Sequence, residues 1–242
     1  MQYEKVAILQ SNYIPWKGYF DIIHDVDLFV FYDDVQYTKN DWRNRNKIKT
    51  PSGTQWLTIP TGTDLNRLIC DVPIFDTLWT KKHWKTLLHA YQKADCFKQY
   101  YDFFQYCYLE KSWNNLSELN QFLIRHIAKE FLGINTQFMD SREFSVSGNK
   151  TERLVEILKM VNAKYYLSGP AGKSYLDKNY FQSAGIEIQY KNYDGYPEYS
   201  QLYPPFEHFV SILDVLFHCG KKSSYYIWEW RFENIPLTEC KE

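Results

Sequence analysis

The sequence predicts an α/β fold in which a mostly parallel sheet is flanked by helices. Short apolar or β-rich runs recur along the 242 residues, and segments with the period of amphipathic helices lie between several of them. A hydrophobic fraction of 45% is enough for a core, and a charged fraction of 24% with a net charge of −1 argues against disorder. Strands that alternate with helices indicate βαβ units, so we expect a Rossmann-like arrangement in a single domain, residues 1–242.

The expected strands are short runs rich in apolar and β-branched side chains. They are Lys5–Gln10, Leu28–Tyr32, Trp56–Pro60, Thr136–Met139, Lys164–Leu167 and Glu187–Lys191. In open α/β sheets, ligands bind beyond the carboxyl ends of the strands. The residues that follow these runs are therefore the first place to look for a site.

Helices are expected where apolar residues recur every three or four positions. They are Leu78–Ala90, Phe97–Leu109, Leu116–Leu132, Thr151–Val161 and Phe206–Cys219. Gly133 and Gly220 follow two of them and suit helix ends, and a Ser-Gly-Asn-Lys entry before Thr151 suits an N-cap. The segment from about residue 69 to residue 112 interrupts the alternation of strand and helix, so we expect a helical insertion there.

The composition argues against several classes of protein. Bulk nucleic-acid binding usually needs a clearly basic domain, so with a net charge of −1 any cationic site must be local. The five cysteines, the last of which is Cys240, are scattered and contain no C-x-x-C pair, which fits neither a disulfide framework nor a zinc ribbon. The sequence shows no signal-peptide core and no run of membrane-spanning length, so we expect a cytoplasmic, reduced protein without a membrane span. The oligomeric state is left open.

The stretch from Gln10 to Lys49 concentrates the candidate binding residues. Arg43, Arg45, Lys47 and Lys49 alternate with other residues, and in an extended segment the period of two places all four on one face. A local row of cations suits a phosphate-bearing ligand, whereas the plain interpretation is a solvated edge strand guarded by charge. The aromatic fraction of 19% adds rings that stack on sugars or bases.

Asp33, Asp34 and His83 are the candidate catalytic residues. The two aspartates end a buried strand and point to opposite faces, so at most one of them heads the site directly. Their candidate roles are Mg²⁺ ligation, general base catalysis and binding of ligand hydroxyls, and the plain alternative is a turn or helix cap. His83 lies on an expected helix with His89 six residues later, which is not a metal-binding spacing. The cofactor is left open with Mg²⁺ as a candidate, and no metal ligands are assigned.

Two turns carry further candidate binding residues. In Asn12–Tyr19, Gly18 permits close approach of a ligand. This turn has the position of the nucleotide-binding turn of adenylyl- and cytidylyltransferases but lacks their signature histidines. Leu167–Tyr175 looks like a phosphate loop, but only two residues separate Gly169 from Gly172, so the P-loop interpretation fails and an anion nest or a plain turn remains. The candidate substrate-binding residues are Gln10, Asn12, Tyr13, Trp16, Gly18, Tyr19, Trp42, Arg43, Asn44, Arg45, Lys47, Ser168, Gly169, Gly172 and Lys173.

These motifs together resemble the WbqC-like family of bacterial proteins along nearly the whole chain. The resemblance rests on QSNYIPWKGYF, on DLFVFYDDVQYTKNDWRNRNKIK followed by WLTIP, on YLSGPAGKSYLD, and on PEYSQLY followed by FVSILDVLFHCG. Ser11 departs from the family pattern, in which a proline is expected. Family members are similar to proteins encoded in O-antigen and other surface-polysaccharide gene clusters. The resemblance implies a role in attaching an aminoacyl group, such as glycine, to an amino sugar, and it supplies no catalytic residues.

Three functions are compatible with these features. The leading one is a transferase that moves an acyl or aminoacyl group to an amino-sugar nucleotide. In this function the cations would bind the diphosphate, and the tryptophans and Tyr19 would stack on the sugar or the base. Asp33 or Asp34 would act as base on the sugar amine or orient it. The second is a nucleotidyltransferase that uses ATP or CTP with Mg²⁺. The third is a noncatalytic binding or scaffold subunit of a glycan-assembly complex, which the lack of a recognisable nucleophile favours.

Overall fold

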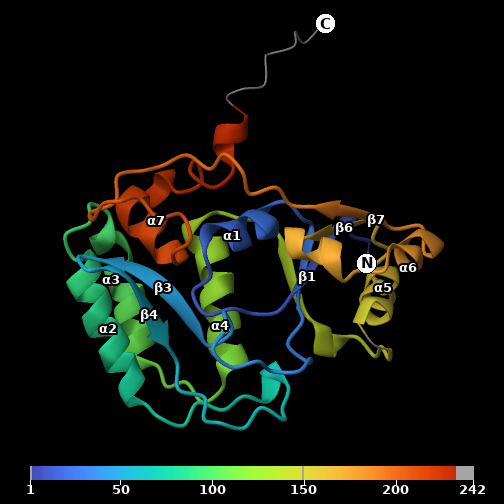
Figure 1. Ribbon diagram of the computed structural model, residues 1–242, viewed down its shortest axis with the longest axis horizontal. Helices are drawn as coiled ribbons and strands as arrows, with labels where there is room; N and C mark the ends of the chain where they lie inside the picture. Colours follow the sequence, from blue (N-terminus) through green and yellow to red (C-terminus); the bar gives the residue numbers. More distant parts are fainter. Residues whose placement is uncertain (1, 149, 233–242) are drawn as a thin grey trace, which may run out of the picture.

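The computed structural model describes residues 2–148 and 150–232, so Cys240 lies outside the described residues. At its centre is a five-stranded sheet in the order β5-β2-β1-β6-β7, and every neighbouring pair of strands is parallel (Figure 1). The strands are β1 (Lys5–Leu9), β2 (Leu28–Phe31), β5 (Gln137–Asp140), β6 (Tyr165–Ser168) and β7 (Glu187–Tyr190). The predicted α/β fold with a mostly parallel sheet is therefore confirmed.

The strand order has its switch point between β1 and β6. From β1 the chain builds outward through β2 and β5, and it then crosses to the other side of β1 to add β6 and β7. At such a point the connections that follow the two neighbouring strands leave toward opposite faces and open a crevice beyond the carboxyl ends. The topology thus marks the place where a ligand site is expected.

Side chains of the central strands alternate between two hydrophobic cores. Ala7, Phe29 and Phe31 belong to the larger core, whereas Val6 and Ile8 belong to the smaller one. This alternation follows from the period of two along a strand. Because both faces are covered, the central strands read as nearly continuous apolar runs, which is why the sequence identified them.

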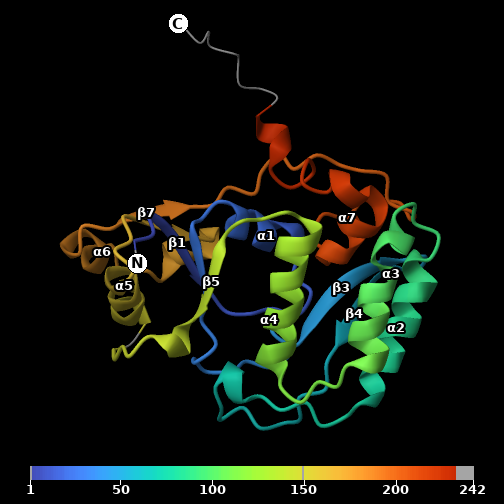
Figure 2. The same ribbon diagram turned by 180° about the vertical axis from the view of Figure 1, so that it is seen from behind.

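Helices cover both faces of the sheet. The larger core receives residues from α1 (Lys17–His24), α2 (Leu78–Tyr91), α3 (Phe97–Gln105), α4 (Leu116–His126) and α7 (Ile212–Cys219), and the smaller one from α5 (Lys150–Met160) and α6 (Lys178–Ser183). Figure 2 shows α4 between the sheet and the pair α2 and α3. Single turns of other helix types are η1 (Ile69–Asp71), η2 (Tyr106–Glu110), η3 (Ile127–Phe131), η4 (Ser141–Glu143), η5 (Pro170–Ser174), η6 (Gly220–Lys222) and η7 (Glu229–Arg231). Across residues 2–148 and 150–232, no helix has the length and apolar character needed to cross a membrane.

The basic run and the predicted strand Trp56–Pro60 stand apart from the parallel sheet. They form an antiparallel hairpin of β3 (Arg45–Thr50) and β4 (Gly53–Thr58), in which Lys47 lies opposite Trp56. Gly53 has a φ of +101° at the tight connection, a backbone conformation that favours glycine. The basic run is extended as predicted, but its strand begins at Arg45.

Helix α7 begins later than the apolar pattern of Phe206–Cys219 predicts. The Ser211 hydroxyl accepts the N–H of Leu213 at 3.2 Å and caps the helix. The Ser211 N–H donates to the Lys47 carbonyl and the Ile212 N–H to the Pro15 carbonyl, both at 2.8 Å. Because these two N–H groups bond to the hairpin and the first turn, they cannot donate to carbonyls one helical turn earlier, and the helix does not extend back to residue 206. Gly220, with a φ of +55°, ends α7 where the sequence predicts.

Candidate functional site

Two loops meet beyond the carboxyl end of β1. The main-chain N–H of Tyr13 donates to the Trp42 carbonyl at 2.9 Å, and the Asn46 amide donates to the carbonyls of Tyr13 and Ile14 at 3.1 and 2.9 Å. The Asn120 amide of α4 donates to the Arg43 carbonyl at 2.9 Å. These bonds hold residues 10–16 and residues 41–46 side by side, so their outward-facing side chains form common walls.

The first wall borders what we call the switch-point cavity, with a volume of about 550 Å³. Its lining comes from the end of β1, the residue after β2, the β6 strand, the start of α5 and the turn after η5. The lining residues are Ile8, Leu9, Gln10, Tyr32, Arg43, Thr151, Leu154, Tyr166, Tyr175 and Leu176. This is the position at which open α/β sheets bind ligands.

Arg43 is the cation of the switch-point cavity. Its Nη1 donates to Asp41 at 3.1 Å, and its Nε is buried without a hydrogen-bond partner among the described residues. A buried donor without a hydrogen-bond partner costs free energy. Such an atom is therefore expected to bond to a ligand or to a water. A guanidinium offers parallel donors that match phosphate or carboxylate oxygens. Arg43 is therefore suited to bind an anion in this cavity.

The second wall borders what we call the tryptophan cavity, with a volume of about 450 Å³. Its lining residues are Asn12, Pro15, Trp16, Trp42, Asn46, Lys47, Glu207 and Phe209. The rings of Trp16 and Phe209 lie 5.4 Å apart at an angle of 36°, and Trp42 is 44% exposed. Exposed aromatic faces of this kind stack on sugar rings or bases. The Asn12 Oδ1 atom is buried and has no partner within the described ranges, which leaves an acceptor available.

The predicted row of four cations is divided by the structure. Arg45 and Lys47 lie over the Trp56 ring, with 4.2 Å and 5.2 Å from the guanidinium carbon and the ammonium to the ring centroid. Arg43 precedes the strand in a turn and lies in the switch-point cavity. Lys49 is 4% exposed and donates to the Pro205 carbonyl. Arg45, Lys47 and Lys49 keep the alternation expected of an extended segment, but Arg43 lies before β3 and the loop after β7 covers Lys49, so the four cations do not form one continuous row.

Asp33 and Asp34 line neither cavity. The Asp33 carboxylate is fully buried and accepts the Ser11 N–H at 2.8 Å, the Gln121 amide at 3.2 Å and the Ser117 hydroxyl. Asp34 forms an ion pair with Arg153 and accepts the Ser141 hydroxyl. The structure thus places both carboxylates in contacts that join the ends of neighbouring strands and helices.

His83 lies in the larger core, away from both cavities. It is 6% exposed, and its Nδ1 is 2.9 Å from the Tyr13 hydroxyl, which contacts the Tyr108 hydroxyl at 2.5 Å. Burial lowers the pKa of His83 to about 4, outweighing a hydrogen bond with the Thr58 main chain. His83 and Tyr13 therefore form a buried polar contact rather than part of the site.

Other candidate binding residues support the two loops from behind. A Cβ on Gly18 would lie 2.2 Å from Trp16 Cζ2, so this glycine makes room for the indole rather than for a ligand. The Tyr19 hydroxyl donates to the Gln10 carbonyl at 2.9 Å. The Asn44 amide donates to the Ile59 carbonyl at 3.0 Å. These side chains fix the shape of the loops and leave no polar group toward a ligand.

The turn after β6 is a compact 3₁₀ turn. The Gly172 N–H donates to the Gly169 carbonyl at 3.0 Å, and a Cβ on Gly172 would lie 2.2 Å from the Ser168 hydroxyl oxygen. The Lys173 ammonium lies 5.4 Å from the centroid of the Tyr190 ring. The Gly172 amide that an anion nest would use is thus already bonded. The turn contributes to the switch-point cavity only through the residues that follow it.

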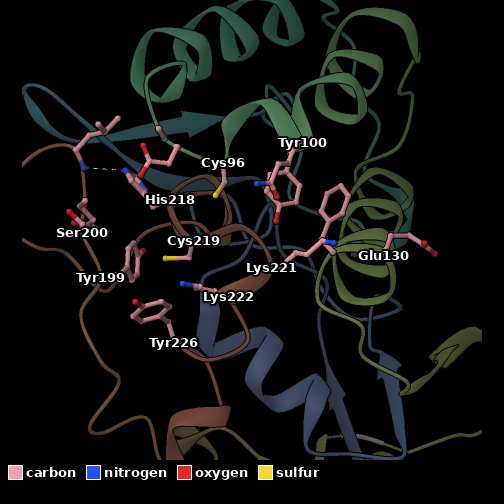
Figure 3. A pocket seen from close by; sticks show the side chains of 16 residues that line it. Cys96, Tyr100, Glu130, Tyr199, Ser200, His218, Cys219, Lys221, Lys222 and Tyr226 are labelled. Atoms are coloured by element: carbon pink, nitrogen blue, oxygen red, sulfur yellow. Dashed lines mark hydrogen bonds between the residues drawn. The ribbon is translucent and has the colours of Figure 1, made fainter.

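A cavity of about 950 Å³, larger than these two, lies elsewhere, between the end of α7, the α2–α3 connection and the loop at residues 199–202 (Figure 3). Its polar side chains include His218, which already has partners. The His218 Nδ1 is 2.7 Å from the Asp214 carbonyl, and its Nε2 accepts the Leu202 N–H at 3.1 Å. Burial raises the pKa of the Cys219 thiol to about 12, so this thiol is protonated. No lining residue carries a buried polar atom without a partner, unlike Arg43 and Asn12.

The structure therefore brings together Gln10 and Arg43 in one cavity and Asn12, Trp16, Trp42 and Lys47 in the next. Sequence reasoning missed Glu207 and Phe209, because they fell in an expected helix. It also missed Tyr32, Thr151 and Tyr166. Tyr32 is the last residue of the predicted strand Leu28–Tyr32, and its place at a strand end was the signal available for it.

Comparisons with known proteins assign the chain to a family and identify a relative. The model of the WbqC-like protein family matches residues 10–226, which contain every residue that lines the two cavities except Ile8 and Leu9. The uncharacterized protein Rv1507c of Mycobacterium tuberculosis (strain ATCC 25618 / H37Rv) is 44% identical over 226 residues, which cover 93% of this chain and 97% of that protein. No solved structure matches the chain. The chain belongs to the WbqC-like protein family.

Proposed function

We propose that this protein binds an amino-sugar nucleotide across the two cavities and that it transfers an acyl or aminoacyl group to the sugar amine in the cytoplasm. The observation that carries the proposal is the adjacency of Trp42 and Arg43. Trp42 lines the tryptophan cavity, and Arg43 lines the neighbouring cavity with a guanidinium whose buried Nε has no hydrogen-bond partner among the described residues. Resemblance to proteins of surface-polysaccharide gene clusters supports a role in polysaccharide synthesis.

The diphosphate would lie between Arg43 and Lys47. Arg43 lines the switch-point cavity and Lys47 the tryptophan cavity, so an anion held by both spans the boundary between them. Arg45 lies beside Lys47 on Trp56 and adds positive charge. Charge-assisted hydrogen bonds to phosphate are stronger than neutral ones, and a local cluster of this kind needs no excess of basic residues in the chain.

The uncharged parts of the ligand would use the aromatic walls. Trp16 and Trp42 present faces for a sugar or a base, and the Asn12 side-chain carbonyl, which has no partner in the described part of the chain, would accept from a ligand hydroxyl or amide. Gln10 supplies a further amide in the switch-point cavity. Each cavity volume falls within the roughly 300–1,000 Å³ of typical small-molecule sites.

The binding part is tested by calorimetry with UDP-, GDP- and dTDP-linked sugars. Arg43→Ala should weaken binding of the preferred sugar nucleotide at least tenfold, because one charged hydrogen-bond donor to phosphate contributes about 1.5–3 kcal/mol. Arg142→Ala is the matched control, since Arg142 is an exposed arginine paired with Asp140 outside both cavities. Equal affinity of the Arg43 variant, with an intact fold by circular dichroism, would contradict the proposal.

Two alternatives predict different results. A nucleotidyltransferase would bind ATP or CTP with Mg²⁺, using Lys17 or Lys173 on the phosphates. Lys17 is 2% exposed, and no group of three His, Cys, Asp or Glu side chains within residues 2–148 and 150–232 is placed to hold a metal ion. A noncatalytic scaffold subunit is favoured by the occupied carboxylates of Asp33 and Asp34. It would turn over nothing alone and co-purify with an enzyme of glycan assembly.

A further inference from the structure

Glu207 is the one carboxylate that lines either of the two cavities, counting the residues of the described chain. It lies in the tryptophan cavity beside Trp16 and Phe209, whereas Asp33 and Asp34 lie outside both. A carboxylate in an aromatic cavity suits a ligand that carries positive charge, because a cation is attracted both by the acid and by the ring faces.

The main chain at Glu207 is held firmly from the inside. The Gln201 amide donates to the Glu207 carbonyl at 3.0 Å and accepts the Glu207 N–H at 2.9 Å. The same Gln201 nitrogen is 2.8 Å from an oxygen of Asp214, a fully buried carboxylate that also accepts the hydroxyls of Tyr91 and Tyr199 at 2.8 and 2.7 Å. Hydrogen bonds to both the N–H and the carbonyl of Glu207 fix its backbone, and so fix the position from which its side chain extends.

The rest of the loop is attached to the walls of the cavity itself. The Ser211 N–H donates to the Lys47 carbonyl, and the Ile212 N–H donates to the Pro15 carbonyl, as described above. Lys47 and Pro15 both line the tryptophan cavity. The segment that carries Glu207 is therefore bonded on one side to Asp214 and on the other to the cavity walls.

The Glu207 side chain keeps capacity for a ligand. Its Oε1 accepts the Phe209 N–H at 2.9 Å, which turns the carboxylate back over its own loop. Its Oε2 has no hydrogen bond to any residue of the described chain. The side chain is half-buried, so one oxygen is available at the cavity surface.

The tryptophan cavity thus has two ends of opposite charge. The Lys47 ammonium lies over Trp56, next to Trp42, while Glu207 lies with Phe209 and Trp16. No ion pair joins Lys47 to Glu207 within the described residues. The neighbouring His208 carries little positive charge, because burial and the nearby Lys17 lower its pKa. An anionic group and a cationic group of one ligand can therefore be bound at different ends of the same cavity.

We infer that Glu207 binds the free, protonated amine of the sugar and so selects an amino sugar over its N-acylated form. This inference rests on the proposed function, since it assigns the binding site of the amine group of the same sugar nucleotide. Acylation removes the charge of the amine and adds bulk beside Trp16 and Phe209. The product of a simple acyl transfer would then bind more weakly than the substrate, which favours its release, whereas an aminoacyl product would carry a charged amine farther from the sugar ring.

The test compares matched ligands that differ only at the nitrogen. Calorimetry at pH 7 measures UDP-glucosamine against UDP-N-acetylglucosamine, and NMR titration measures glucosamine against N-acetylglucosamine as free sugars. The wild type should bind each amine roughly tenfold more tightly than its N-acetyl form, as expected for one charge-assisted contact. Glu207→Gln should remove this preference and leave the affinity for UDP-N-acetylglucosamine within about twofold. Glu198→Gln, at an exposed glutamate on the same segment and outside both cavities, should keep the preference.

The outcomes separate the inference from the proposal beneath it. If UDP-sugars bind tightly but Glu207→Gln retains the preference for the amine, or if the wild type shows none, the assignment of Glu207 is wrong and the proposed function stands. If UDP-, GDP- and dTDP-sugars all bind no better than the free sugars, the sugar-nucleotide proposal fails. In that case a preference for free glucosamine that depends on Glu207 would still support the amine site.

Discussion

The carboxylate of Asp33 accepts the main-chain N–H of Ser11 at 2.8 Å, and this bond joins the ends of β2 and β1. With Ser117 and Gln121 of α4 bonded to the other oxygen, Asp33 acts as a junction between two strands and a helix. The loop that begins at Ser11 carries Asn12 and Trp16 into the tryptophan cavity. A residue that looks catalytic in the sequence therefore sets the position of the candidate site.

Asp33→Asn should destabilise the fold. The amide nitrogen replaces an oxygen that faces two donors, so at least one hydrogen bond to a charged group is lost and a donor is left buried. We expect a loss of about 2–4 kcal/mol in the free energy of unfolding by urea titration. Asp194→Asn, at an exposed position, is the control. If the variant kept its stability but lost ligand binding, Asp33 would instead be a residue of the ligand site.

Gly18→Ala should displace the Trp16 indole. The new Cβ would lie 2.2 Å from the ring, and overpacking of this kind costs about 1–3 kcal/mol. We expect lower stability and weaker sugar-nucleotide binding, measured by thermal unfolding and calorimetry. The matched control is Gly169→Ala, whose Cβ would meet its nearest neighbour, the Tyr193 hydroxyl oxygen, at 3.7 Å. Full binding by the Gly18 variant would show that Trp16 is not part of the ligand site.

His83 should make stability depend on pH. Burial lowers its pKa in the folded state to about 4, below the ordinary value of 6.5. The unfolded chain therefore binds more protons between these values, and the stability contributed by neutral His83 is present above pH 6.5 and is lost as the pH falls toward 4. The wild type should lose about 2 kcal/mol more than His83→Gln between pH 7 and pH 5 in urea titrations. Parallel pH profiles of the two proteins would refute a buried neutral imidazole.

The buried charge of Lys17 should destabilise the folded state. Its ammonium is buried without a hydrogen-bond partner among the described residues and lies 4.7 Å from the centroid of the Tyr196 ring. Burial lowers its pKa to about 8, so the unfolded chain binds more protons from pH 8 to pH 10.5 and stability rises with pH in that range. Lys17→Met should raise the unfolding free energy at pH 7 by about 1–3 kcal/mol, with a smaller gain at pH 10. A less stable Met variant would mean that the aromatic rings compensate the buried charge.

The sheet was predictable from sequence, and the hairpin was predictable only in part. The strands β1 and β2 are buried on both faces, so their apolar runs show in the sequence without further context. The row from Arg43 to Lys49 would share one face only if the whole segment were extended, but a turn at Asp41 holds Arg43 outside β3. The Asp41 carbonyl accepts the Asn44 and Arg45 N–H groups at 3.3 and 3.2 Å. Turns stabilised by main-chain bonds of this kind leave little trace in a charge pattern.

The site was harder to predict because distant segments decide it. The Asp33 carboxylate accepts hydrogen bonds from side chains that lie 84 and 88 positions further along the chain. Neither contact can be inferred from local spacing. Glu207 was assigned to a helix because the pattern up to Cys219 has a helical period. Tertiary hydrogen bonds from Ser211 to Lys47 and from Ile212 to Pro15 outweigh that local preference. Trp16, Trp42 and Arg43 were found because they stand in a dense motif next to a strand end.

The most direct test of the sugar-nucleotide site is a thermal-shift screen of the wild-type protein with UDP-, GDP- and dTDP-sugars against ATP and CTP, each with and without Mg²⁺. A ligand present at a hundred times its dissociation constant stabilises the folded state by about 2.7 kcal/mol, which raises the melting temperature by several degrees. The account predicts such a shift with at least one sugar nucleotide in the absence of Mg²⁺. A shift only with ATP or CTP plus Mg²⁺, or no shift with any compound, would contradict it.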